Sequence, residues 1–268
     1  MIRKDVILPA VQHMPGLAIV YRKRLRGLLE QMHRSVVYWV LAAYRQNEPR
    51  IVGLAQDAAP ADALNKIMQE LGKRWRSRFD DSSKDLAAYF AQATSKRTDA
   101  QLRAILKKAG FTIPYKLTKA QQDVFKATVN ENVGLIKTIP EQYLSKVNGA
   151  VTRAIQAGHD VGALKKELEH GYGITERRAS LIARDQTRKA TAAFTRVRQL
   201  EVGATEAIWM HSHAGKQPRP SHVKAGRDKV RYNIAEGWYD PDEDKYIVPG
   251  ELINCRCSSK TIIPGFML

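Results

Sequence analysis

The chain has few acidic residues, and this shortage decides which partners suit it. Among its 268 residues, 27 Asp and Glu stand against 44 Lys and Arg, which gives a formal net charge of +17. Such an excess attracts polyanions through phosphate contacts and counterion release, so nucleic acid is the first expected partner. A basic surface also serves solubility, or docks an acidic protein.

Cysteine is nearly absent. Cys255 and Cys257 are the only two, and they lie two positions apart. This count excludes a disulfide framework, and the short spacing disfavours a disulfide between the pair on geometric grounds. We therefore expect free or metal-bound thiols in a reducing compartment.

Long apolar runs are also missing. The longest, Val36 to Tyr44, is far below the roughly 20 residues that span a bilayer. The first residues, Met1 to Ala10, lack the basic start, apolar centre and small-residue cleavage site of a signal peptide. We expect a soluble protein with no membrane partner.

The first three fifths of the chain have the apolar spacing of helices. Residues Pro15 to about Gln46 carry one long apolar stripe, and a second stripe begins at Asp62 and runs past Phe79. More helix is expected up to Gly110. The capping spacings at Thr118 and Thr138 predict two further helices, which end before Asn132 and near Gly158.

Two more helices are expected from Asp160 to Leu168 and from Thr175 to about Glu201, with a turn at Gly171-Tyr172-Gly173 between them. Beyond Gly203 the texture changes to short β-prone runs separated by Gly, Pro and Asp clusters. These runs are 207–210, 229–234, 246–248 and 258–263. The expected fold is mainly α: an elongated helical N-terminal region followed by a small, loop-rich α+β C-terminal module.

The C-terminal module holds a candidate metal site. Its ligands are drawn from His211 or His213, with His222, Cys255 and Cys257. Zinc favours four such ligands in a tetrahedron, and a small module with little core gains stability from a structural zinc ion. The alternative is that the histidines bond backbone carbonyls while the thiols pack as small apolar groups.

Catalysis by the same histidines needs a carboxylate partner. An acidic run follows at Asp240, Asp242, Glu243 and Asp244, and it could hold magnesium while a histidine acts as a base. The run also has the composition of an ordinary solvated turn, and neither a nucleophile elbow nor a phosphate-binding glycine loop is present. We therefore predict that the chain is not an enzyme.

Several clusters of basic residues lie on the predicted helices. Two helices joined at Gly171 to Gly173 have the outline of a helix-hairpin-helix, whose turn amides can meet a DNA phosphate. Any helical hairpin needs such a turn, and basic clusters on helices are usually solvated faces. Trp75 stands among four of the charges. The candidate nucleic-acid contacts are Arg22, Lys23, Arg24, Lys73, Arg74, Arg76, Arg78, Lys165, Lys166, Arg177 and Arg178.

A series of landmarks gives the C-terminal part a family resemblance. In order they are Ile182-Ala183-Arg184-Asp185-Gln186-Thr187, Gly203, Trp209, His211-Ser212, Pro218-Arg219-Pro220-Ser221-His222, Pro249-Gly250-Glu251 and Ile253-Asn254-Cys255-Arg256-Cys257. With these, the region from about Asp160 to Pro264 resembles the phage Mu F-like head morphogenesis family of minor head proteins. The ordered series is more specific than any one motif.

This resemblance implies a structural protein of a tailed phage, present in few copies. It implies partnership with the portal protein and the major capsid protein, a place in the capsid interior near the portal, and a role in head assembly and DNA packaging or delivery. During assembly such a protein is in the host cytoplasm. Packaged double-stranded DNA, bound without sequence preference, suits the basic charge.

Two domains are expected: a helical docking region at 1–158 and a Mu F-like head morphogenesis domain at 159–268. Amphipathic helices without enzymatic motifs suit docking to partner helices or to a symmetric ring. The alternatives are a metal-dependent enzyme or effector that processes nucleic acid, and a plain non-specific DNA-binding protein.

Overall fold

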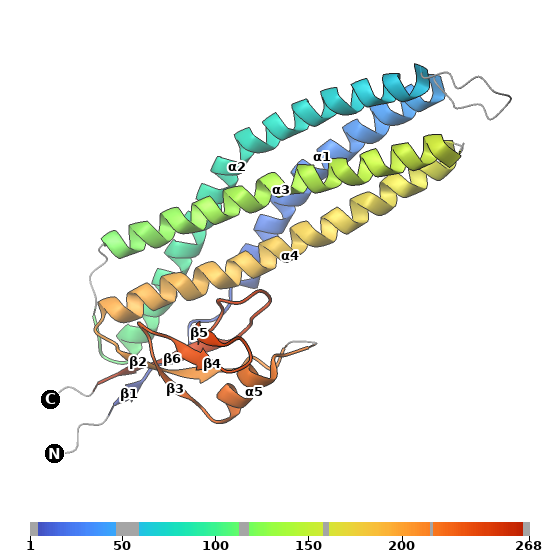
Figure 1. Cartoon of the computed structure of the whole chain (residues 1–268). Helices are drawn as coiled ribbons and strands as arrows, with labels where there is room; N and C mark the ends of the chain where they lie inside the picture. The colour runs from blue at the N-terminus through green and yellow to red at the C-terminus, as the bar shows by residue number, and fades with distance from the viewer. Residues whose placement is uncertain (1–4, 47–58, 113–117, 158–160, 215–216, 265–268) are drawn as a thin grey trace, which may run out of the picture. The chain divides into compact units, whose positions relative to one another are not determined.

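The computed structural model describes residues 5–46, 59–112, 118–157, 161–214 and 217–264. The fold is mainly α, with a small β-containing C-terminal part, as the sequence predicts (Figure 1). The elements in chain order are β1 (Val6–Ile7), α1 (Pro15–Gln46), α2 (Ala59–Lys108), α3 (Lys119–Ala157), α4 (Val161–Glu201), β2 (Glu206–Met210), α5 (Pro220–Arg227), β3 (Arg231–Asn233), β4 (Trp238–Asp240), β5 (Lys245–Ile247) and β6 (Ser258–Ile263). No described helix is long and apolar enough to cross a membrane.

The described chain forms two compact units, and each of the four long helices α1 to α4 contributes to both. Unit 2 consists of residues 19–88 and 130–183. Unit 1 combines residues 1–18, 89–129 and 184–268, so it gathers segments from both ends of the chain. The predicted domain boundary near residue 158 stays a prediction.

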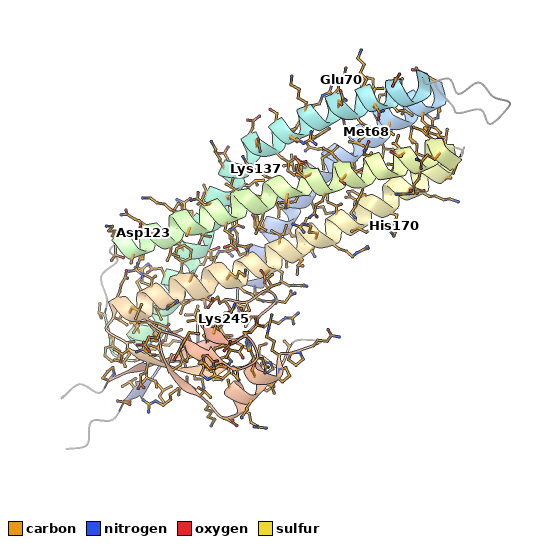
Figure 2. All side chains as sticks on the ribbon, viewed as in Figure 1. Met68, Glu70, Asp123, Lys137, His170 and Lys245 are labelled. Carbon is orange, nitrogen blue, oxygen red and sulfur yellow. The ribbon has the colours of Figure 1, made fainter. Side chains whose placement is uncertain are left out.

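Unit 2 is a bundle of four helical segments. Its helices are amphipathic, as Figure 2 illustrates on α2, where Met68 is buried and Glu70 is exposed. The apolar stripe of α1 lies in the core, including Leu25, Leu29 and Val36. Burial of one stripe from each helix explains why these segments are helical without strong intrinsic propensity.

Two predicted helix breaks in unit 2 are wrong. Helix α4 continues through Gly171 and Gly173, and the Thr175 hydroxyl donates to the Gly171 carbonyl oxygen at 3.0 Å, a bond within the helix. The candidate helix-hairpin-helix is therefore absent. The reason is packing: every third or fourth residue stays buried across the glycines, so the apolar stripe overrides their weak propensity. These residues are Leu164, Leu168, Thr175, Ala179 and Ile182.

Helix α3 shows the same effect. Thr118 caps its start, because its side-chain oxygen accepts a hydrogen bond from the Gln121 backbone N–H at 3.3 Å. Thr138 caps nothing, since it lies inside the helix and its hydroxyl donates to the Leu135 carbonyl at 2.7 Å. Pro140 is also inside the helix, between the buried residues Ile139 and Tyr143.

Unit 1 contains the sheets. Four strands form a sheet in the order β1-β6-β2-β3, and β4 pairs with β5 in a separate hairpin. The central pairing, β2 with β6, is antiparallel and places Trp209 opposite Ser259. Strand β1 pairs Val6 with Ile263, so the N-terminal segment forms one edge of the C-terminal sheet.

Two apolar clusters stabilise unit 1. One joins Leu8 and Val11 of the N-terminal segment to Leu102 and Leu106 of α2 and Ile263 of β6. The other surrounds Trp209 and includes both cysteines of the chain. The second cluster holds the candidate site.

Candidate metal centre

Helix α5 carries the first residue of the site, His222. The helix starts at Pro220, whose fixed φ suits the first turn. The acidic segment folds back on this start: the Asp242 carboxylate accepts the Ser221 backbone N–H at 3.0 Å, and Glu243 pairs with Arg219 at 2.9 Å. These contacts fix the first turn of α5, and so the position of His222.

The loop before β6 carries the two cysteines. It makes a close approach to α4 at Gly250, where a Cβ would lie 2.8 Å from the Ala192 Cβ at a φ of +89°. Asn254 has a φ of 61°, and its backbone N–H donates to the Asp185 carboxylate at 2.6 Å. A tight turn, closed by the bond from Cys255 N–H to the Leu252 carbonyl at 2.9 Å, then directs both thiols inward.

His222, Cys255 and Cys257 form a cluster with the spacing of metal ligands. The His222 Nδ1 atom lies 3.5 Å from the Cys255 Sγ and 3.6 Å from the Cys257 Sγ. The three ligand atoms all lie within 4.8 Å of one another, and all three residues are buried. It is the one group of this kind found among the described residues.

Asp240 holds the imidazole of His222 from the other side. Its carboxylate lies 3.1 Å from the His222 Nε2 and is fully buried. Nε2–H therefore donates to Asp240, and the lone pair of Nδ1 faces the two sulfur atoms. A carboxylate on the second ring nitrogen is typical of a metal-bound histidine.

The interpretation of the acidic run as a solvated turn is wrong for Asp240. Asp242 and Asp244 are exposed, whereas Asp240 ends the short strand β4 inside the module. Sequence reasoning missed it by treating the four carboxylates as one group. The useful signal was its position directly after Trp238 and Tyr239, a β-prone pair, and before Pro241.

The thiols of Cys255 and Cys257 differ in pKa because they are hydrogen-bonded to each other. A hydrogen bond from Cys257 lowers the pKa of Cys255, while the same contact, together with burial, raises the pKa of Cys257. The Trp209 indole N–H has no nitrogen or oxygen acceptor in the described part of the chain, and it favours the thiolate form of Cys257. The environment therefore stabilises the Cys255 thiolate, and a bound cation would also stabilise the Cys257 thiolate.

His211 lies at the edge of this cluster, outside the three-residue group. Burial lowers its pKa, and repulsion from His213 and His222 adds to the effect. Gly226 of α5 allows the approach, since a Cβ at this position would clash with the His211 Cβ. The ring of His211 faces His213, with the two Nδ1 atoms 3.4 Å apart.

Cys255, His222 and Asp240 also follow the order of a nucleophile, a base and an orienting carboxylate. Their exposed fractions are 4%, 3% and 0%. A nucleophile needs a route for its substrate, and these burial values do not provide one. The arrangement suits a buried ligand set better than a catalytic triad.

All of the candidate nucleic-acid contacts belong to unit 2, and ten of the eleven are exposed, with Arg178 half-buried. Some have protein partners: Arg76 pairs with Glu141 at 2.7 Å, and Arg78 donates to Gln31 at 2.9 Å. Trp75 is 4% exposed and is covered by the guanidinium of Arg78. It is therefore a core residue and no platform for a nucleic-acid base.

The three residues of the candidate metal centre lie in a part of the chain that matches a known protein family. Residues 145–260 match the sequence model of a family described as phage Mu protein F like protein, which confirms the resemblance drawn from the C-terminal landmarks. A Haemophilus influenzae protein, described as uncharacterized, is 32% identical over 203 residues, which are 75% of this chain and 43% of that protein. The chain thus spans less than half the length of this relative. No solved structure matches.

Proposed function

We propose that the chain is a minor head protein of a tailed phage that acts with the portal protein and the major capsid protein in head assembly and in DNA packaging or delivery. The match of residues 145–260 to a phage Mu protein F like family supports a role in head morphogenesis. The net charge of +17 suits a place in the capsid interior beside packaged DNA. We retain the helical region 1–158 as the docking part of this proposal.

The docking hypothesis is best tested by point substitution. Deletion of residues 1–110 would also remove β1 and the α2 segment that complete unit 1, so it would not isolate docking. Tyr38 and Trp39 on α1 are 67% and 46% exposed and stack edge to face. Such exposed aromatic pairs are typical of interfaces.

We expect the double variant Tyr38→Ser, Trp39→Ser to lose capture by a purified portal ring, measured by co-sedimentation. The matched control is Tyr239→Ser, Tyr246→Ser, an exposed pair on the β4–β5 hairpin of unit 1. Equal capture of both variants would argue against docking through α1.

The C-terminal module is proposed to bind one structural zinc ion, and one observation supports this most directly. Zinc bonds of about 2.0–2.1 Å to nitrogen and about 2.3 Å to sulfur, at tetrahedral angles, place the two atoms about 3.6 Å apart. The distances from His222 Nδ1 to the sulfurs are 3.5 and 3.6 Å. The two nitrogen–sulfur distances thus match the spacing that a tetrahedral zinc site has.

His211 is the proposed fourth ligand. It follows β2 directly, and it lies near enough to His222 and Cys255 for their charges to affect its pKa. We expect His211→Ala to weaken zinc binding, while His213→Ala, which removes the neighbouring ring, leaves zinc binding unchanged. Competition with a chromogenic chelator measures both. Equal affinities for the two variants would assign the fourth position to a group other than His211.

DNA binding is proposed to use the basic faces of unit 2 without reading sequence. Lys165 and Lys166 on α4 are both exposed. Since each phosphate contact adds about 0.9 to the slope of log affinity against log salt, Lys165→Gln, Lys166→Gln should reduce that slope by up to about 2. Fluorescence anisotropy with a short duplex measures it. Magnesium-dependent nicking of a plasmid that is lost in His222→Ala would instead support the enzymatic alternative.

A further inference from the structure

Unit 1 contains a small pocket with basic walls, whose lining includes Cys257, one of the candidate metal ligands, but neither His222 nor Cys255. The N-terminal segment, α4 and the start of β6 form it, and its interior of about 30 Å³ widens to about 470 Å³ with the open mouth included. Arg188 and Arg196 line it, and no Asp or Glu does. A water molecule needs roughly 10–15 Å³ on the interior measure, so the pocket has room for a group larger than one water.

Two buried nitrogen atoms on the pocket wall lack hydrogen-bond partners. They are the Arg188 Nη1 and the His13 Nδ1, and neither finds a partner within the described ranges. The other ring nitrogen of His13 donates to the Arg256 carbonyl at 2.9 Å, so Nδ1 presents a lone pair. Unsatisfied buried polar atoms are costly, and two in one pocket indicate a polar occupant.

The charges of the pocket are also unbalanced. Arg196 donates to the carbonyl oxygens of Ile234 and Ala235 at 2.8 and 2.6 Å, which leaves its charge without a carboxylate. Neither guanidinium forms an ion pair in the part of the chain that the structure describes. The carboxylate near Arg188 is Asp185, which is engaged by the Asn254 N–H and by Lys189.

We propose that this pocket binds a phosphate group, with Arg188 as its charged donor. A phosphate oxygen accepts from the Arg188 Nη1, and in free phosphate a protonated oxygen also donates to the His13 Nδ1, so that one group satisfies both atoms. A DNA phosphodiester carries no such proton and would satisfy the Arg188 Nη1 alone. The Arg196 charge adds to the attraction. The phosphate is either free in solution or part of a DNA backbone, and binding requires neither zinc nor the portal.

The test is calorimetric titration of the full chain with inorganic phosphate at constant ionic strength, with chloride as the reference anion. Wild type should show saturable binding at one site per chain. Arg188→Gln should weaken it by at least tenfold, and Arg188→Lys, which keeps the charge but loses the buried Nη1, should weaken it less. The control is Lys224→Gln, which removes an exposed charge on α5 and should change affinity by less than twofold.

A second titration distinguishes the two sources of phosphate. If the pocket takes a DNA phosphate, inorganic phosphate will compete with a short duplex in wild type but not in Arg188→Gln. If it takes free phosphate, the duplex will leave phosphate binding unchanged. The proposal is overturned if neither titration shows binding that depends on Arg188, because the pocket then takes no phosphate group. Equal losses in Arg188→Gln and Lys224→Gln would also overturn it, since they would show general charge attraction.

Discussion

Among the described residues, each unit buries one histidine, and the partners of these two histidines differ. In unit 2 the His33 Nδ1 lies 2.5 Å from the Tyr143 hydroxyl, and its Nε2 lies 3.3 Å from the Glu169 carboxylate. In unit 1 the His222 Nε2 lies 3.1 Å from Asp240, and its Nδ1 faces two sulfur atoms. Both rings are nearly fully buried, at 7% and 3% exposure.

The difference shows that burial alone does not mark a functional histidine. Both nitrogens of His33 have oxygen partners, and Tyr172 stacks on its face at 4.3 Å, so the ring is satisfied as a structural group. For His222, the Nε2 atom is held by the Asp240 carboxylate, and the Nδ1 atom lies beside the two cysteine sulfur atoms. Of the two arrangements, only the one around His222 offers a set of metal ligands that a bound cation would join.

Metal removal should have the largest effect, and it should act on unit 1 alone. A structural zinc site contributes folding free energy directly, so chelation should cost at least about 4 kcal/mol. At about 2–4 °C for each kcal/mol, the melting temperature of unit 1 should fall by about 10 °C or more. Calorimetry with and without a strong chelator measures this. A single transition that chelation does not move would contradict the contrast between the units.

Asp240→Asn should have the next largest effect. The variant keeps the shape of the side chain but loses the charge that fixes the His222 tautomer, and such outer partners typically contribute about 10- to 100-fold in metal affinity. Asp244→Asn is the matched control, because Asp244 is exposed in the same turn and accepts a hydrogen bond from the Tyr239 hydroxyl rather than from helix α5. Competition for zinc against a chelating dye should separate the two. Equal affinities would mean that Asp240 does not position the ligand.

His33→Gln should have a smaller effect, of a different kind. It removes a buried ring with two hydrogen bonds, which should cost about 1–2 kcal/mol. Urea unfolding measures the loss, and metal content should stay at the wild-type level. If zinc content also fell, the two histidines would not be independent, and their separation into a structural and a ligand role would be wrong.

The smallest expected effect is a pH dependence from His33. Burial lowers the pKa of His33, while Glu169 opposes the shift. The unfolded chain, with a histidine pKa of about 6.5, then binds more protons than the folded chain between the two values. Stability should therefore be fully present above about pH 6.5 and should be lost as the pH falls toward the folded pKa. Melting temperatures of wild type and His33→Gln between pH 7.5 and 5.5 check this, and the variant should show the flatter curve.

Much of the helical fold was predictable from the sequence. The helix from Pro15 to Gln46 and the strand from Ser258 to Ile263 match their predicted bounds. Glycines and capping spacings inside α3 and α4 predicted helix ends that the structure does not have. A local preference of about 1 kcal/mol is weaker than the free energy gained by burying an apolar stripe. Strand β1 could not be predicted, since its partner lies at the other end of the chain.

The residue types of the site could be predicted from the sequence, but its geometry could be predicted only in part. The residue types His222, Cys255 and Cys257 stood out because histidine and cysteine together are the usual zinc ligands. Helix α5 was missed, and Asp240 was misread, because their roles depend on contacts between residues 18 positions apart. Spacing along the chain does not reveal such contacts.

The contrast between the two units depends on metal binding by His222, Cys255 and Cys257. Metal binding can be measured by plasma mass spectrometry of the full chain, purified without chelator and then dialysed against trace zinc. We expect about one zinc per chain in wild type and in His33→Gln, and none in Cys257→Ser. Wild-type protein without zinc, or Cys257→Ser with the wild-type amount, would show that the two thiols are packed core groups and hold no metal.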